Sequence, residues 1–257
     1  MPLLVVCLLL EEKLGSVLWL GQWLALGPIL VEVMERPWDL NKAMAVGGLA
    51  GMALQSGLLG IWALEQGVAP WTLLTRNLEE AFQQTLSLHS PQALSPVDSA
   101  KMEALASRLV RVLVALIPGI FASVILLLHW WNLLVVRRFP WLWGGVAPGP
   151  DKLDQWGMPY TWVWVTIAGG ILALLPIEVL AVVGANLLVI MSSIHFLQGI
   201  AVMASVFRQR AVPRSLRAVI YALVFLQQVF LLAVMVIGLF DVWFDFRKRW
   251  GAPTLRA

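Results

Sequence analysis

Long apolar stretches, separated by short polar breaks, run along almost the whole chain. A helix needs about 20 mainly apolar residues to cross the hydrocarbon core of a bilayer, and stretches close to this length recur. Arg, Lys, Pro and Gly cluster in the breaks. The pattern therefore predicts a single all-α domain, 1–257, built as a bundle of membrane-spanning helices. The six predicted spans cover residues 14–33, 43–64, 112–136, 160–175, 178–207 and 216–240.

Two more helices are predicted to lie at the membrane surface, over residues 71–88 and 96–111. In the first, apolar residues such as Trp71 and Leu78 recur at three- and four-residue intervals opposite a polar face. That spacing is typical of a helix lying flat in the interface. The second has Pro96 in its first turn, as helix starts often do, and we expect it to continue into the third span.

Composition supports a membrane protein. Only 13% of the residues are charged, against about a quarter in soluble domains, so the lipid bilayer is the expected partner. Basic clusters flank the apolar segments, which indicates contact with anionic headgroups and no nucleic acid partner. Residues 2–10 lack the charged start and cleavage site of a signal peptide. We expect them to lie at the interface or to belong to a longer first helix.

Orientation should follow the Lys and Arg residues near the spans, which favour the cytoplasmic side. In the six-span arrangement one side, shared by both termini, holds Lys13, Arg76, Lys101, Arg108, Arg111, Arg247, Lys248, Arg249 and Arg256. The other side holds Arg36, Lys42, Arg137, Arg138, Lys152, Arg208, Arg210, Arg214 and Arg217. The two sets are equal in size, so the count chooses neither orientation.

Small residues mark one face of the second predicted span. Ala43, Gly47 and Gly51 recur at intervals of four, a spacing that lets two helix backbones approach closely in a membrane. We expect this face to pack against protein, either in the same chain or in another subunit.

Polar side chains lie inside the fifth predicted span, where they are costly unless they face partners. Asn186 and Ser193 share one helix face, and His195 and Gln198 share another. One interpretation is functional: some of these four residues would line a cavity that binds a ligand. The alternative, which we favour for polar groups of this kind, is that they bond neighbouring helices and hold the bundle together.

The last apolar stretch ends in GLFDVWFDFRKRW. An ion pair between Asp245 and Arg249, four residues apart, would suit a helix end, and Trp243 would lie at the interface. Asp241 lies one turn deeper and needs its own partner, which we expect to be an arginine from another loop. With Arg247, these acids form the candidate C-terminal motif.

Neither a catalytic set nor a cofactor site is expected from the sequence. It contains no phosphate-binding glycine loop, no zinc-protease helix motif, no nucleophile elbow and no pair of membrane-depth acids arranged for proteolysis. His89, His129 and His195 have no second metal ligand at usable spacing on their own helices. We therefore predict a protein that is not an enzyme and holds no metal.

Three stretches, DQWGMPYTWVWVTIAGG (154–170), IHFLQGIAVM (194–203) and GLFDVWFDFRKR (238–249), resemble the YybS-type bacterial membrane proteins, a family of unknown function. That family is remotely similar to the S components of energy-coupling-factor vitamin transporters, which bind a nutrient and rely on separate ATPase and coupling subunits. The resemblance implies an inner-membrane protein with both termini in the cytoplasm. It also implies that the small-residue face at Ala43, Gly47 and Gly51 docks those subunits.

Two functions are therefore considered. The leading hypothesis is a non-catalytic, small-solute-binding component of a transporter, and it expects a buried cavity lined by Asn186, His195 or Gln198. The alternative is a structural or assembly subunit that binds another membrane complex through helix–helix contacts. That hypothesis expects tight packing and an exposed apolar groove.

Overall fold

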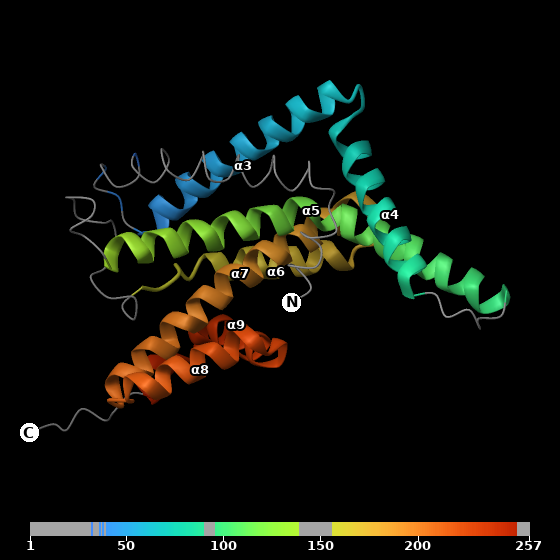
Figure 1. The fold of residues 1–257 in the computed structure, drawn as a ribbon. Coiled ribbons are helices and arrows are strands. Elements are labelled where there is room, and N and C mark those ends of the chain that lie inside the picture. The colour runs from blue at the N-terminus through green and yellow to red at the C-terminus, as the bar shows by residue number, and fades with distance from the viewer. Residues whose placement is uncertain are drawn as a thin grey trace, which may run out of the picture.

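The computed structural model describes residues 32, 36, 38, 40–89, 96–138 and 156–250, and the regular structure in them is helical (Figure 1). The helices are α3 (Leu40–Glu65), α4 (Pro70–His89), α5 (Pro96–Arg138), α6 (Trp162–Leu174), α7 (Glu178–Gln209), α8 (Arg214–Leu226), α9 (Gln228–Phe244) and α10 (Phe246–Trp250). The expected all-α fold is confirmed for these residues. The predicted span 14–33 lies outside them, apart from Glu32 at its end.

Three helices, α3, α5 and α7, are long and apolar enough to cross a membrane. They correspond to the predicted spans 43–64, 112–136 and 178–207, which are therefore confirmed as helices of spanning length. The predicted helix 96–111 continues without a break into the next span, so α5 has 43 residues. At about 1.5 Å per residue this is roughly twice the thickness of the hydrocarbon core. The first turns of α5 and all of α4 accordingly extend to one side of the bundle (Figure 1).

The contacts between these helices fix their directions. Gly47 of α3 faces His129 of α5, and Gly51 faces Ile125, so the two helices are antiparallel. Ala115 and Gly119 of α5 contact Asn186 of α7, whereas Leu133 belongs to one packed cluster with the later residues Leu197 and Ile200. Helices α5 and α7 are therefore parallel. Their C-terminal ends lie on the side of the bundle where α3 begins.

Helix α6 is a short companion of α7. Its Gly169 lies close to Gly184 and Leu187 of α7, and the turn between the helices contains Pro176. Its 13 residues cover about 20 Å, less than the roughly 30 Å of the hydrocarbon core. The predicted span 160–175 is thus a helix, but it is too short to cross on its own.

The predicted sixth span, 216–240, was wrong as a continuous helix. The chain breaks at Gln227, whose backbone is extended (φ −115°, ψ 117°), and α8 and α9 meet at an angle of 103°. The break falls at the Gln227–Gln228 pair, the two consecutive polar residues of an otherwise apolar run. The described residues therefore contain three candidate spans, or four if the bent pair counts as one. Six spanning helices are not confirmed.

Candidate functional site

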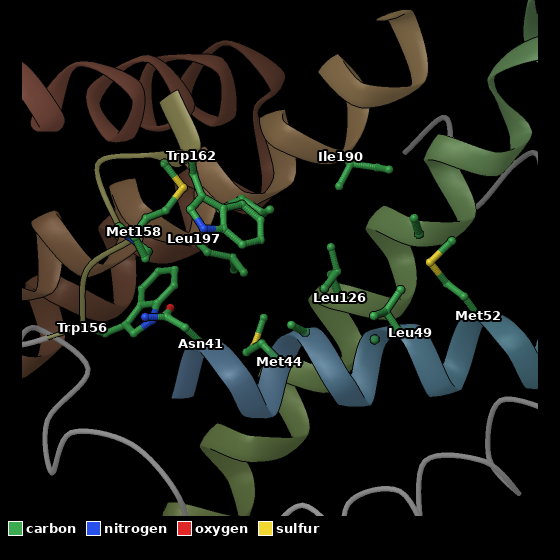
Figure 2. Close-up of a pocket in the computed structure, with 15 residues that line it drawn as sticks. Asn41, Met44, Leu49, Met52, Leu126, Trp156, Met158, Trp162, Ile190 and Leu197 are labelled. Atoms are coloured by element: carbon green, nitrogen blue, oxygen red, sulfur yellow. The ribbon is translucent and has the colours of Figure 1, made fainter. Parts of the chain in front are cut away.

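An apolar cavity of about 330 Å³ lies between α3, α5, α7 and the segment 156–162. It is partly open to the outside of the bundle, since Leu49 in its lining is 67% exposed. Figure 2 shows the labelled side chains of α3 and of this segment pointing into a common space. Three methionines and two tryptophans take part in the lining, namely Met44, Met52, Met158, Trp156 and Trp162. Methionine is flexible and polarizable, so such walls adapt to apolar ligands of irregular shape.

One polar corner interrupts this lining. Asn41, at the start of α3, accepts a hydrogen bond of 2.9 Å through Oδ1 from Trp156 Nε1. Among the described residues that line the cavity, Asn41 is the only one with an amide side chain. A cavity of this volume and composition is typical of a site for a small, largely apolar molecule with few polar groups.

The wall formed by residues 156–159 is irregular backbone buried in the bundle. Trp156 and Met158 are 5% and 8% exposed, so their backbone polar groups need partners inside the protein. Gln198 of α7 supplies one, because its Oε1 accepts a hydrogen bond of 2.9 Å from the Met158 N–H. Gln198 therefore fixes the position of the cavity wall through the Met158 backbone, although Gln198 itself does not line the cavity.

The other end of the Gln198 amide contacts Asp241. Nε2 donates a hydrogen bond of 2.8 Å to Asp241 Oδ2, and the Phe246 N–H donates one of 3.0 Å to Oδ1. Arg247 Nε lies 3.5 Å from Oδ2. The carboxylate is therefore buried, at 8% exposed, with a hydrogen-bonded amide on one side and a guanidinium on the other. This network joins the cavity wall to α7, α9 and α10.

The partner of Asp241 differs from the expected one. We expected an arginine from another loop, but Arg247 belongs to the same motif. Asp245 explains how it reaches back, since it takes a left-handed conformation (φ 46°) that ends α9 and reverses the chain. Asp is one of the residues that tolerate this region. Without that reversal, residues six apart on one helix would face different directions.

The predicted Asp245–Arg249 ion pair was also wrong. Asp245 pairs with Lys248 at 2.5 Å, and this contact raises the pKa of the exposed Lys248. Arg249 instead places its guanidinium over the Phe244 ring. The Asp245 carbonyl accepts the Arg249 N–H at 3.2 Å at the start of α10, but the two side chains have different partners. Trp243 is 55% exposed on α9, and its location at the membrane interface stays a prediction.

The structure brings together only part of the other predicted site. His195 Nε2 lies 2.8 Å from Thr166 Oγ1 of α6, and Ser193 bonds the Val189 carbonyl of its own helix. Neither residue lines the cavity. The described residues contain no group of three or more His, Cys, Asp or Glu that could hold a metal ion.

Asn186 joins α7 to the neighbouring helix α5 through two side-chain hydrogen bonds. Its Oδ1 accepts a hydrogen bond of 2.6 Å from the Gly119 N–H, and its Nδ2 donates one of 2.8 Å to the Ala115 carbonyl. These two groups are the partners of one ideal helical hydrogen bond, next to Pro118, whose missing N–H weakens the helix there. Gly119 has no side chain to keep α7 away, since a Cβ would lie 2.8 Å from Asn186 Oδ1.

The small-residue face of α3 is covered inside the chain. Ala43 is fully buried, and a Cβ added at Gly47 would overlap the His129 ring of α5. Gly51 lies against Ile125. The face therefore packs against protein as its spacing indicates, but α5 occupies it, so it is not available for another subunit.

A closer helix contact was not singled out from the sequence. A Cβ added at Gly238 of α9 would overlap the His195 carbonyl oxygen, and one at Gly199 would overlap the Val234 carbonyl oxygen. The two glycines thus let the backbones of α7 and α9 touch, as small residues do in membranes. Gly199 is four residues after His195, and Gly238 is three residues before Asp241. Both therefore lie close in sequence to residues that the sequence had already indicated.

These features define an integral membrane protein of packed apolar helices. The chain belongs to the DUF2232 family of predicted membrane proteins, whose model matches residues 2–242. Neither the curated proteins nor the solved structures contain a match to the chain. The YybS name and the likeness to transporter S components stay predictions.

Proposed function

We propose that this protein is a non-catalytic component of a bacterial inner-membrane transporter, and that it binds a small apolar solute in the α3–α5–α7 cavity. The observation that carries the proposal is the cavity itself, about 330 Å³ and almost wholly apolar, which lies in the range of small-molecule sites. The polar residues expected in the ligand site, Asn186, Ser193 and His195, bond protein groups elsewhere. The solute is therefore apolar, with at most a polar group near Asn41.

The form of the cavity wall supports a role in transport. Secondary transporters build their substrate sites where helices are interrupted at membrane depth, because irregular backbone there is tolerated only in protein or beside a cavity. Here the irregular segment 156–161 leads into the short helix α6 and contacts the middle of α7 through Gln198. Energy for uphill transport would come from separate ATPase and coupling subunits.

A structural or assembly role is the second candidate. It is favoured by the part of the molecule that extends beyond the bundle, where Trp71, Leu105 and Leu109 are 48%, 60% and 53% exposed on α4 and α5. Leu73 and Leu74 on the same α4 helix are buried against Trp62 and Ala63, so α4 has one face free for a partner.

The two candidates can be separated by native mass spectrometry of the full chain purified in a mild detergent. Transport predicts one apolar small molecule retained in stoichiometric amount and co-purified ATPase and coupling subunits. An empty protein that repeatedly recovers another membrane complex would overturn the proposal in favour of assembly.

A further inference from the structure

The chain leaves the end of α7 into α8 and returns to the same end of α7 after α9, in α10. Helix α8 starts at Arg214, shortly after α7 ends at Gln209. Beyond α9, the Arg247 carbonyl accepts a hydrogen bond of 3.2 Å from Gln209 Nε2. Between these points the chain bends by 103° at Gln227. A span that crossed the bilayer would carry Arg247 to the opposite surface, away from Gln209.

This return gathers basic residues at one end of the bundle. Since α5 and α7 end there and α3 begins there, the end holds Arg36, Lys42, Arg137, Arg138, Arg208, Arg210, Arg214, Arg217, Arg247, Lys248 and Arg249. The opposite end holds Arg76, Lys101, Arg108 and Arg111 among the described residues. Among the described residues the two ends therefore hold eleven and four basic residues, whereas the six-span arrangement divides the same residues into eight and seven. Lys and Arg near span ends favour the cytoplasmic side.

The surface at this basic end has the composition of a headgroup-binding site. Trp243 and Phe244 are 55% and 43% exposed, and exposed aromatic rings are common at membrane interfaces. Lys248 extends outward with 85% of its side chain exposed. Arg217 lies further in and donates hydrogen bonds to the Phe207 and Val212 carbonyls, so it fixes the turn after α7 while its neighbours face outward.

We propose that α8 and α9 form a re-entrant hairpin, and that the end of the bundle from which it enters and leaves is a basic surface that binds anionic phospholipid headgroups on the cytoplasmic face. Anionic lipids attract juxtamembrane cations over about a Debye length. The inference does not depend on what the cavity binds.

Cysteine labelling tests the hairpin and its orientation. In a chain with Cys7→Ser, single substitutions Arg210→Cys, Arg249→Cys and Lys101→Cys are treated with a membrane-impermeant maleimide in intact spheroplasts and after permeabilisation. Arg210→Cys and Arg249→Cys should both label only after permeabilisation, and Lys101→Cys should label in intact cells. Labelling of the first two from opposite sides would overturn the hairpin. Labelling of both from outside, or of neither after permeabilisation, would overturn the cytoplasmic surface.

Lipid retention tests the headgroup partner. The full chain is reconstituted with equal phosphatidylglycerol and phosphatidylcholine, re-extracted, and its bound lipids are measured by native mass spectrometry. Replacing Arg214, Lys248 and Arg249 together by Gln should lower the bound phosphatidylglycerol ratio by up to about fivefold per charge removed. Lys101→Gln, Arg108→Gln and Arg111→Gln together, at the opposite end, are the matched control. Equal ratios in the two triple variants would sink the proposal.

A salt titration of the native chain covers the case in which a triple variant does not fold. Because surface electrostatics are screened at high ionic strength, retained phosphatidylglycerol should fall as salt is raised from about 0.05 to 0.5 M. If the amount of retained phosphatidylglycerol did not change with salt concentration, the headgroup charge would not be the feature that the protein recognises.

Discussion

Replacing Asp241 by Asn should destabilise the bundle far more than the same change at Asp245. The Asp241 carboxylate is 8% exposed, and it lies 3.5 Å from the Arg247 guanidinium, whose side chain is 18% exposed. Removing one partner of a buried pair costs about 3–5 kcal/mol, because the other charge stays buried. Asp245 and Lys248 are 47% and 85% exposed, and pairs of this kind contribute about 0–1 kcal/mol.

The two variants should therefore differ by at least about 2 kcal/mol, or about 30-fold in the unfolding equilibrium. The assay is unfolding of the purified protein in mixed detergent micelles, followed by circular dichroism. A double-mutant cycle with Arg247→Gln identifies the source, since the double variant should cost less than the sum of the single ones. Equal, small effects of Asp241→Asn and Asp245→Asn would refute the reasoning, because both acids would then only decorate the end of α9.

Further substitutions test the helix contacts by the same unfolding assay. Gly238→Ala should cost about 1–3 kcal/mol or more, because the new methyl overlaps the α7 backbone. At Gly60 an added Cβ would meet no atom within 4 Å, so Gly60→Ala should be neutral or stabilise by up to about 1 kcal/mol. A larger loss of stability from Gly60→Ala than from Gly238→Ala would show that α7 and α9 do not touch. Asn186→Ala should cost about 1–2 kcal/mol through its lost bonds to α5. Ser192→Ala, which loses only a hydrogen bond within α7, should cost less. Equal losses of stability in the two variants would show that the Asn186 hydrogen bonds to α5 do not stabilise the bundle.

The local pattern of the sequence was sufficient for the long helices. Apolar length located α3 and α7, and three- and four-residue periodicity located α4. The break between α8 and α9 was missed because the apolar run continues on both sides of Gln227. Polar residues in such a run also occur in straight helices when they face partners. The extended backbone of Gln227 locates the break, and the contacts of the C-terminal motif with Gln198 and Gln209 show that the chain returns to α7.

Gln198, Asp241 and Arg247 of the polar network beside the cavity were predictable as residues, but their pairings were not. Gln198 and Asp241 were both singled out as buried polar groups, yet they are 43 residues apart, and helical periodicity relates only residues within a few turns. The left-handed turn at Asp245 changed the partners of both acids. The cavity was missed because its lining is ordinary apolar residues, which in sequence look like any core-facing helix surface.

Filling the cavity tests the central claim, that the space between α3, α5 and α7 holds an apolar molecule. Ala45 lines it, and Ala53 is exposed on the same helix, so Ala45→Phe and Ala53→Phe form a matched pair. Native mass spectrometry of the full chain should show the same bound apolar molecule in the wild type and in Ala53→Phe, and none in Ala45→Phe. Retention by Ala45→Phe, or an empty wild-type protein, would contradict the claim.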